Sequence, residues 1–264
     1  MTAGGRAAPS REDLDQSGSL TLRLVDAAGM AAFFGLMALL ALEVDAGLAL
    51  FEGYAWWVLS FSAIGGYLWA DFVSGFFHFL ADTYGSVHTP FLGPVFFRTF
   101  REHHVDPLAI TRHGFLEVNG ANCIISLPFL AVTVGLVPIG ESLTGLVIGA
   151  FMFAFLVGIF FTNQFHRWAH LPAPPPWIQR LQSTGLVLGV AHHQRHHVAP
   201  YDTCYCITSG LMNPVLARLR FFETIKAPLG RLVEPLVGKA EEVVLEPTLD
   251  PSKDSLGERS SSRW

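Results

Sequence analysis

The chain has 264 residues, of which 51% are hydrophobic and only 15% are charged. Its mean hydropathy of +0.40 is too high for an ordinary soluble domain, and its formal net charge of -5 leaves no basic surface for nucleic acid. Its 3 cysteines are too few for a disulfide framework. The composition therefore predicts a single all-α integral membrane domain.

Continuous apolar runs predict four transmembrane helices, because a helix needs about 20 residues to cross the hydrocarbon. These spans are expected at residues 24–42, 54–79, 121–138 and 143–165. Residues 177–191 form a shorter apolar stretch, which we expect to lie on the interface or to re-enter the membrane without crossing it. The domain then covers residues 24–231, between flexible polar tails at 1–23 and 232–264.

Basic residues give the predicted orientation. All 17 Lys and Arg lie in the tail up to Arg23, between Arg98 and Arg112, or from Arg167 onward. The positive-inside rule places these regions in the cytoplasm. Four crossings then put both termini and the ends of the second and fourth spans on the cytoplasmic face. No cleavable signal segment is recognisable, so the first span is expected to be retained. A bacterial inner membrane is the favoured location, with the endoplasmic reticulum as the eukaryotic equivalent.

Histidines gather beside the ends of these spans, on the side predicted to be cytoplasmic. Residues four apart share a helix face, and this spacing recurs in His78 with Asp82, His166 with His170, His192 with His196, and His193 with His197. His103 and His104 lie between these pairs in the chain. Neutral imidazole is the commonest protein ligand for iron, zinc and copper. The pattern therefore predicts a histidine-rich cap that binds metal.

The number of candidate ligands favours two metal ions. A single zinc takes four ligands, and the histidines exceed that number. Haem held by paired axial histidines is the competing interpretation, although it would leave most of the histidines unused.

Four motifs resemble the plasmanylethanolamine desaturases, the CarF/Kua family of histidine-rich membrane lipid desaturases. They are DFVSGFFHFLADTYGSV (71–87), FREHHVDPLAITRHGFLEVNG (100–120), FTNQFHRWAH (161–170) and HHQRHHVAPYDTCYCITSG (192–210). The resemblance covers about residues 54–225. It implies a di-iron enzyme that uses O2 and two electrons to convert 1-O-alkyl (plasmanyl) ethanolamine phospholipids to 1-O-alk-1'-enyl (plasmenyl) phospholipids, which forms the vinyl ether of plasmalogens.

The same resemblance implies the site residues. The expected iron ligands, or residues that closely support iron, are His78, Asp82, His103, His104, His166, His170, His192, His193, His196 and His197. His113 and Asn163 are candidates for orienting those ligands. The implied partners are a membrane ether phospholipid and an external electron donor resembling cytochrome b5 or ferredoxin. His88 stands outside the pattern, and we interpret it as an exposed loop histidine.

Two other functions stay open at the level of sequence. The same scaffold is compatible with a desaturase or hydroxylase of ordinary lipid-bound acyl chains, since a chloroplast desaturase has similar histidine motifs. The chain could instead be a non-enzymatic metal or haem protein of the membrane. A requirement for ether lipid separates the first alternative from the plasmalogen function, and the absence of an O2-dependent lipid product defines the second.

Overall fold

The computed structural model describes residues 20–90 and 92–238 of the chain. The elements in chain order are α2 (Leu20–Leu50), η1 (Glu52–Tyr54), α3 (Ala55–Thr83), η2 (Gly93–Phe97), α4 (Arg98–Val105), α5 (Ala109–Arg112), α6 (Phe115–Leu136), α7 (Leu143–Ala169), α8 (Pro176–Ser183), α9 (Val190–Gln194), α10 (Asn213–Arg218) and α11 (Phe221–Val237). No strand occurs in these residues, which confirms the predicted all-helical class.

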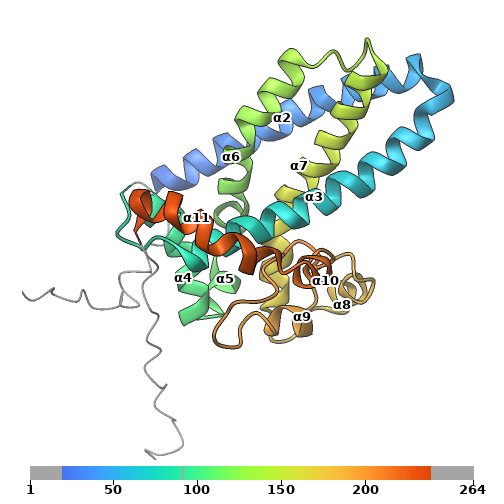
Figure 1. The fold of residues 1–264 in the computed structure, drawn as a ribbon. Coiled ribbons are helices and arrows are strands. Elements are labelled where there is room, and N and C mark those ends of the chain that lie inside the picture. The colour runs from blue at the N-terminus through green and yellow to red at the C-terminus, as the bar shows by residue number, and fades with distance from the viewer. Residues whose placement is uncertain (1–19, 91, 239–264) are drawn as a thin grey trace, which may run out of the picture.

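Four long helices, α2, α3, α6 and α7, form the body of the molecule (Figure 1). α3 packs mainly on α7 and α2 mainly on α6, while α6 and α7 join the two pairs. Large apolar side chains fill the interior, among them Phe33, Leu40 and Leu130, each at most 2% exposed. Such a continuous apolar core is how long, uniformly hydrophobic helices associate.

Glycine allows α3 and α7 to approach each other closely. A Cβ on Gly66 of α3 would lie 2.6 Å from the carbonyl oxygen of Phe151 and 2.8 Å from the Cβ of Ala154, both on α7. Small residues at such positions let two helix backbones approach each other. α7 begins at a side-chain cap, in which the hydroxyl of Ser142 accepts a hydrogen bond from the amide of Gly145 at 3.0 Å.

Within residues 20–90 and 92–238, three helices are long and apolar enough to cross a membrane: α2, α6 and α7. The prediction of four spans is therefore wrong. α3 has 29 residues and lies in the bundle, but glycine, serine, tryptophan, Asp71 and His78 interrupt its apolar sequence. With these residues, no stretch of α3 has the continuous apolar character of the three candidate spans. Polar and ionisable residues inside a membrane bundle usually mark a functional site.

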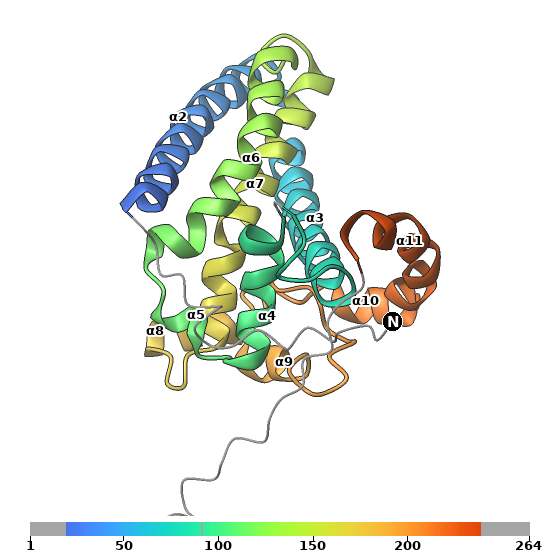
Figure 2. The ribbon, with the colours of Figure 1, turned by 90° about the vertical axis from the view of Figure 1, so that its left-hand side faces the viewer.

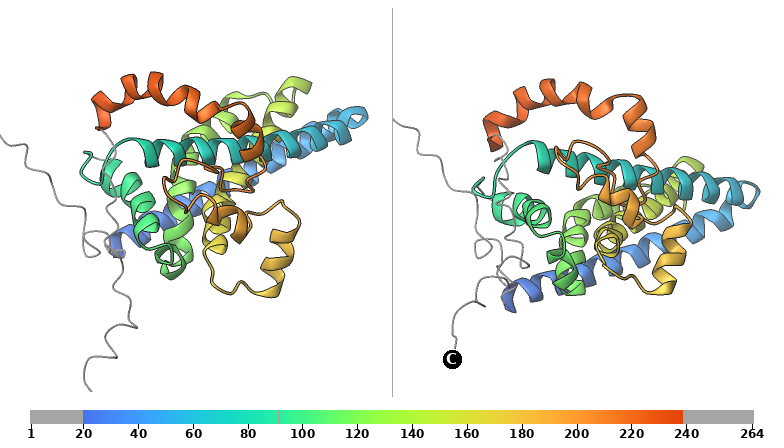
Figure 3. Two further views of the ribbon diagram at one scale, coloured as in Figure 1. Left: turned by 60° about the horizontal axis from the view of Figure 1, so that its bottom comes forward. Right: turned by 90° about the horizontal axis from the view of Figure 1, so that it is seen from below.

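Short helices gather at one end of the bundle. Figures 2 and 3 show α4, α5, α8, α9 and α10 at the end opposite the α2–α3 and α6–α7 connections. The stretch 177–191 holds only the eight-residue α8 and the start of α9. At about 1.5 Å per residue neither helix can cross a bilayer, as expected, and a place on the interface or a re-entrant path stays a prediction.

The last described helix, α11, covers the end of α3. Its Phe222, Ile225 and Leu229 pack against Phe79 and Tyr84. α11 ends at Val237, inside the C-terminal region that was expected to be a flexible tail from residue 232. Residues 1–19 and 239–264, the greater part of the two expected tails, lie outside the described residues.

Candidate metal centre

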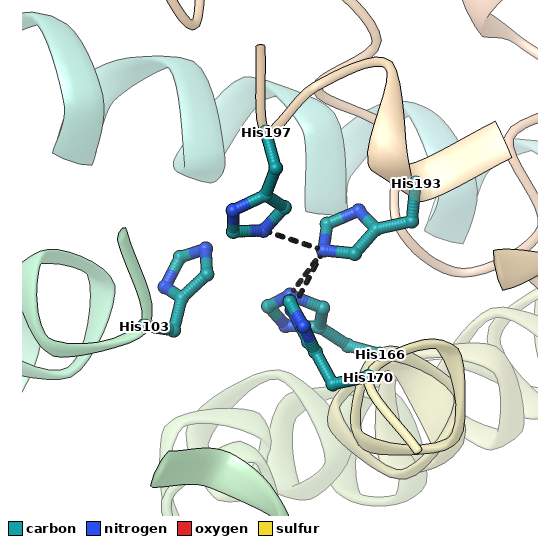
Figure 4. Close-up of side chains that lie close together, drawn as sticks. All are labelled: His103, His166, His170, His193 and His197. Atoms are coloured by element: carbon teal, nitrogen blue, oxygen red, sulfur yellow. Dashed lines mark hydrogen bonds between the residues drawn. The ribbon is translucent and has the colours of Figure 1, made fainter. Parts of the chain in front are cut away.

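Five histidines from three parts of the chain converge at the end of the bundle. They are His103 from α4, His166 and His170 from the end of α7, His193 from α9 and His197 just after it (Figure 4). We call them the five-histidine group. One nitrogen of each ring lies within 4.8 Å of the corresponding nitrogen of every other ring. His193 is central, because its Nε2 lies 2.9 Å from that of His170 and 3.0 Å from that of His197.

Hydrogen bonds alone cannot satisfy this arrangement. The Nε2 atoms of His166, His170 and His193 form a triangle with sides of 2.9, 2.9 and 3.1 Å. Each nitrogen either carries a proton or presents a lone pair, so at least two of the three must be alike and repel each other. Metal–nitrogen bonds of about 2.1 Å place neighbouring ligand atoms about 3 Å apart. A bound cation therefore fits the triangle, and a hydrogen-bonded histidine cluster does not.

A second group lies beside the first. His78, His103, His104 and His196, the four-histidine group, also have ligand atoms within 4.8 Å of one another. His103 belongs to both groups. The carboxylate of Asp82 faces this second group, with its oxygens 3.4 Å from His78 Nε2, 3.3 Å from His104 Nε2 and 3.3 Å from His196 Nε2. The sharing of His103 places two candidate metal positions next to each other.

Backbone carbonyls orient two rings of the four-histidine group. His78 donates from Nδ1 to the carbonyl of Tyr205 at 3.0 Å, and His196 donates from Nδ1 to the carbonyl of Thr203 at 2.8 Å. A neutral ring that donates from Nδ1 presents a lone pair at Nε2. Both lone pairs then point toward an oxygen of Asp82, a repulsive contact that a cation between them reverses. One carboxylate could balance at most one protonated ring, yet three rings surround it.

Burial keeps the histidines outside the spans in the neutral form that metal binding requires. Loss of hydration, reinforced by the neighbouring histidines, holds the pKa of His103 and of His193 well below its usual range. The same causes lower the pKa of His170 to about 4. These rings therefore need not release a proton before they bind a metal at neutral pH.

The arrangement also discriminates between cofactors. Imidazole-rich sites suit iron, zinc, copper and nickel. Haem requires a flat space for its macrocycle between the axial ligands. The Nε2 atoms of the five-histidine group instead approach one another to about 3 Å, which leaves no such space between them. The geometry therefore fits single metal ions held by imidazole better than haem, and the number of ions stays a prediction.

The structure brings together nine of the ten predicted ligands and leaves His192 out. His192 lies in neither histidine group. Its Nε2 lies 2.8 Å from the amide of Asn213, and its ring packs on Gly210. α9 directs the ring of His193 to the five-histidine group and the ring of His192 toward Asn213 and Gly210. The structure does not bring His192 and His196 into one histidine group.

The two residues predicted to orient the ligands have partners outside the histidine groups, and their orienting role stays a prediction. His113 follows α5 and pairs through Nδ1 with Glu117 at 2.9 Å. Asn163 donates to the carbonyl of Val118 at 2.9 Å and to the side chain of Asn122 at 3.2 Å. Asn163 thus ties α7 to α6. His88 is exposed in its loop, as expected.

One buried residue near the centre was missed from the sequence. Asp71, fully buried in α3, accepts hydrogen bonds from three backbone amides of the loop that carries Tyr205. An ionisable residue in an apolar helix is a signal of function, and this signal could have identified Asp71. The carbonyls of Thr203 and Tyr205 leave no trace in the sequence, because any residue supplies a carbonyl.

Comparison with known proteins agrees with the motif resemblance. Residues 67–240 match the family described as the lipid desaturase domain. The chain is 46% identical over 168 residues to "Plasmanylethanolamine desaturase" of Myxococcus xanthus, covering 64% of this chain and 59% of that protein. It is 41% identical over 180 residues to "Plasmanylethanolamine desaturase 1" of Mus musculus, covering 67% and 65%.

A plant relative is more distant. The chain is 36% identical over 163 residues to "Fatty acid desaturase 4, chloroplastic" of Arabidopsis thaliana, covering 61% of this chain and 48% of that protein. The matches to the bacterial and mouse relatives span about three fifths of the length of those proteins. No solved structure gives a significant match.

Proposed function

The chain belongs to the lipid desaturase domain family, and on this basis we propose that it is a membrane di-iron desaturase that forms the vinyl ether of plasmalogens. Its substrate is a 1-O-alkyl (plasmanyl) ethanolamine phospholipid, and its product is the 1-O-alk-1'-enyl (plasmenyl) lipid. O2 and two electrons are consumed. The names of the bacterial and mouse relatives support this substrate.

The observation that carries the proposal is the pair of adjacent histidine groups that share His103. Eight histidines and Asp82 would hold the two iron ions: His78, His103, His104, His166, His170, His193, His196 and His197, with the carboxylate of Asp82 facing the four-histidine group. When bound, iron supplies the O2-dependent oxidation that no amino-acid side chain can perform.

The protein contributes position and exclusion of water. His78, His193 and His196 are at most 1% exposed, so the centre is shielded from bulk solvent. His166 is near the end of α7, one of the candidate membrane spans. An ether bond lies just below the lipid headgroup. A centre at the end of a span is therefore at the depth where the first two carbons of the alkyl chain would reach it.

Arg167 provides a cation for the lipid phosphate. It follows His166 at the end of α7, and its Nη2 donates to the carbonyl of Thr111 at 3.1 Å. Its buried Nε has no hydrogen-bond partner. Arg112, in contrast, already pairs with Asp106 at 2.7 Å. A phosphate oxygen could accept a charge-assisted hydrogen bond from this unpaired Nε, so Arg167 is better suited than Arg112 to bind the lipid phosphate.

The histidine end of the bundle is proposed to face the cytoplasm. Arg98, Arg112 and Arg167 lie at this end, and the two loops at the opposite end carry no Lys or Arg. The positive-inside rule assigns that charge asymmetry to the cytoplasmic side of a bacterial inner membrane or of the endoplasmic reticulum. An external electron donor of the cytochrome b5 or ferredoxin type would approach from the same side.

Desaturation of ordinary acyl chains is the second candidate, supported by the 36% identity to the chloroplast fatty acid desaturase. The two functions are separated by offering the purified, iron-loaded chain two lipids with O2 and a reductant. One lipid carries a 1-O-alkyl chain and the other a 1-O-acyl chain of equal length on the same ethanolamine headgroup. Mass spectrometry should detect an acid-labile product, two hydrogens lighter, from the ether lipid alone. A desaturated product from the acyl lipid alone would establish the second candidate.

A further inference from the structure

We propose that Asp71 is a positioning residue that keeps the four-histidine group of the metal centre in its binding geometry. It holds the loop 203–213, whose carbonyls orient His78 and His196, and it thereby supports the four-histidine group while leaving the five-histidine group in place. This inference rests on the proposed function, since it concerns the same two metal ions.

Asp71 is the point on α3 to which the loop is attached. Its side chain is 0% exposed. Oδ1 accepts from the amides of Ser209 at 2.7 Å and Gly210 at 2.9 Å, and Oδ2 accepts from the amide of Met212 at 2.9 Å. A buried carboxylate is costly unless hydrogen bonds replace its hydration. Three backbone donors replace it here, so the carboxylate and the loop stabilise each other.

Further contacts fix the loop along the face of α3. Ser74, one turn after Asp71, accepts from the amide of Ile207 at 3.2 Å. Asn213 accepts from the amide of Cys206 at 2.9 Å and donates to its carbonyl at 3.0 Å. A Cβ on Gly75 would lie 2.4 Å from the Sγ of Cys206. The loop therefore follows the surface of α3 without a gap.

The loop transmits its position to two of the metal-binding rings. Tyr205 directly precedes Cys206, and its carbonyl accepts a hydrogen bond from Nδ1 of His78. The carbonyl of Thr203 accepts one from Nδ1 of His196. Both bonds select the tautomer whose Nε2 lone pair faces Asp82. Hydrogen bonds to the far nitrogen of a ligating histidine fix its orientation, and their loss typically weakens metal binding about 10–100-fold.

The five-histidine group also has anchors of its own. His166 is part of α7, with His170 directly after it, and the amide of His193 bonds to the carbonyl of Gly189 at 3.0 Å. The loop also meets α7 through Thr208, whose hydroxyl lies 2.7 Å from that of Thr162. Two side-chain hydroxyls make this contact, and none of the three amides bound by Asp71 takes part in it. Loss of Asp71 should therefore weaken one metal site and spare the other.

Substitution by asparagine gives the most selective test. In Asp71→Asn the oxygen of the new side-chain amide could still accept from Ser209 and Gly210, but its NH2 group would face the amide of Met212, donor against donor. Asp71→Ala removes all three bonds, and Ser74→Ala removes a different anchor of the same loop. Asp202→Asn is the matched control, because Asp202 is an exposed carboxylate in the sequence just before this loop.

In the experiment, the full-length chain is stripped of metal in detergent and titrated with Co²⁺. The visible absorption of the bound Co²⁺ reports how many ions bind and how tightly. The unchanged chain and Asp202→Asn should bind two ions. Asp71→Asn should weaken one of them about tenfold or more, and Asp71→Ala should weaken the same one further, while the other keeps its affinity. Ser74→Ala should act in the same direction, which keeps the test decisive if Asp71→Ala does not fold.

Three results would overturn the inference. If Asp71→Asn and Ser74→Ala bind both ions with the affinities of the unchanged chain, the loop does not determine the geometry of the four-histidine group. Parallel loss of both ions would give Asp71 only a general folding role. If the unchanged chain does not bind two ions, both the proposed metal centre and this inference are wrong. If the unchanged chain binds two ions but the variants lose neither selectively, only the inference is wrong.

Discussion

The Nε2 atoms of His166 and His193 lie 2.9 Å apart, although the residues are 27 positions apart in the chain and belong to α7 and α9. His170 completes a triangle with them. The fold thus directs ring nitrogens from separate helices to one point, and a cation at that point removes their mutual repulsion. This convergence is the basis for the metal-dependent chemistry proposed for the chain.

Metal content should depend on His193 more than on any exposed histidine. His193→Ala removes the central ring of the five-histidine group, so purified protein should lose about one metal ion per chain. His88→Ala is the control, because His88 is an exposed histidine in a loop. Metal analysis of the two variants purified in parallel makes the comparison. Equal metal in both would contradict the assignment of His193 as a ligand.

His192 should be dispensable for metal, although its sequence position resembles that of a ligand. Its ring packs on Gly210 and contacts Asn213, so His192→Gln should keep both ions while His193→Gln loses one. Metal analysis again gives the readout, with thermal unfolding as a check on folding. A loss of metal in His192→Gln equal to that in His193→Gln would restore His192 to the ligand set.

Arg167→Gln should raise the lipid concentration needed for half-maximal rate. A charge-assisted hydrogen bond contributes about 1.5–3 kcal/mol, so loss of the proposed phosphate contact should increase KM about tenfold or more and leave kcat nearly unchanged. Arg180→Gln, on the exposed face of α8, serves as the matched loss of charge. If both variants show the same kinetics as the unchanged chain, Arg167 does not bind the headgroup.

Packing of α3 on α7 should be intolerant of added volume. Gly66→Ala puts a methyl group 2.6 Å from a backbone oxygen of α7, which should cost about 1–3 kcal/mol of stability. Gly35→Ala adds the same methyl group where nothing lies within 4 Å, and its stability should not fall. Thermal unfolding in detergent compares them. A Gly66→Ala protein as stable as Gly35→Ala would mean that the two helices are not in close contact.

Several features of the fold and site could be predicted because they depend on local patterns. Apolar length located α2, α6 and α7, and the i,i+4 spacing paired His166 with His170. Other features depend on contacts that spacing does not encode. His192 and His193 are adjacent, and only the rotation of α9 in the folded chain decides between them.

The loop that orients His78 and His196 could not be predicted for a related reason. It does so through backbone carbonyls, which every residue possesses, and Asp71 meets it across more than 130 positions of sequence. The span count was wrong because α3 has the length of a membrane helix without the apolar composition. Length alone did not reveal that this helix carries the buried polar residues Asp71 and His78.

The most direct test of the central claim is a lipid analysis of cells that lack plasmalogens. The cells would be supplied with an alkyl ether lipid and would express the chain, its His170→Ala or His196→Ala variant, or the His88→Ala control. Acid-labile vinyl ether lipids should appear with the unchanged chain and the control, and should be absent with both other variants, because each removes a ring from one histidine group. No vinyl ether from a folded, iron-loaded chain with a working reductant would contradict the claim.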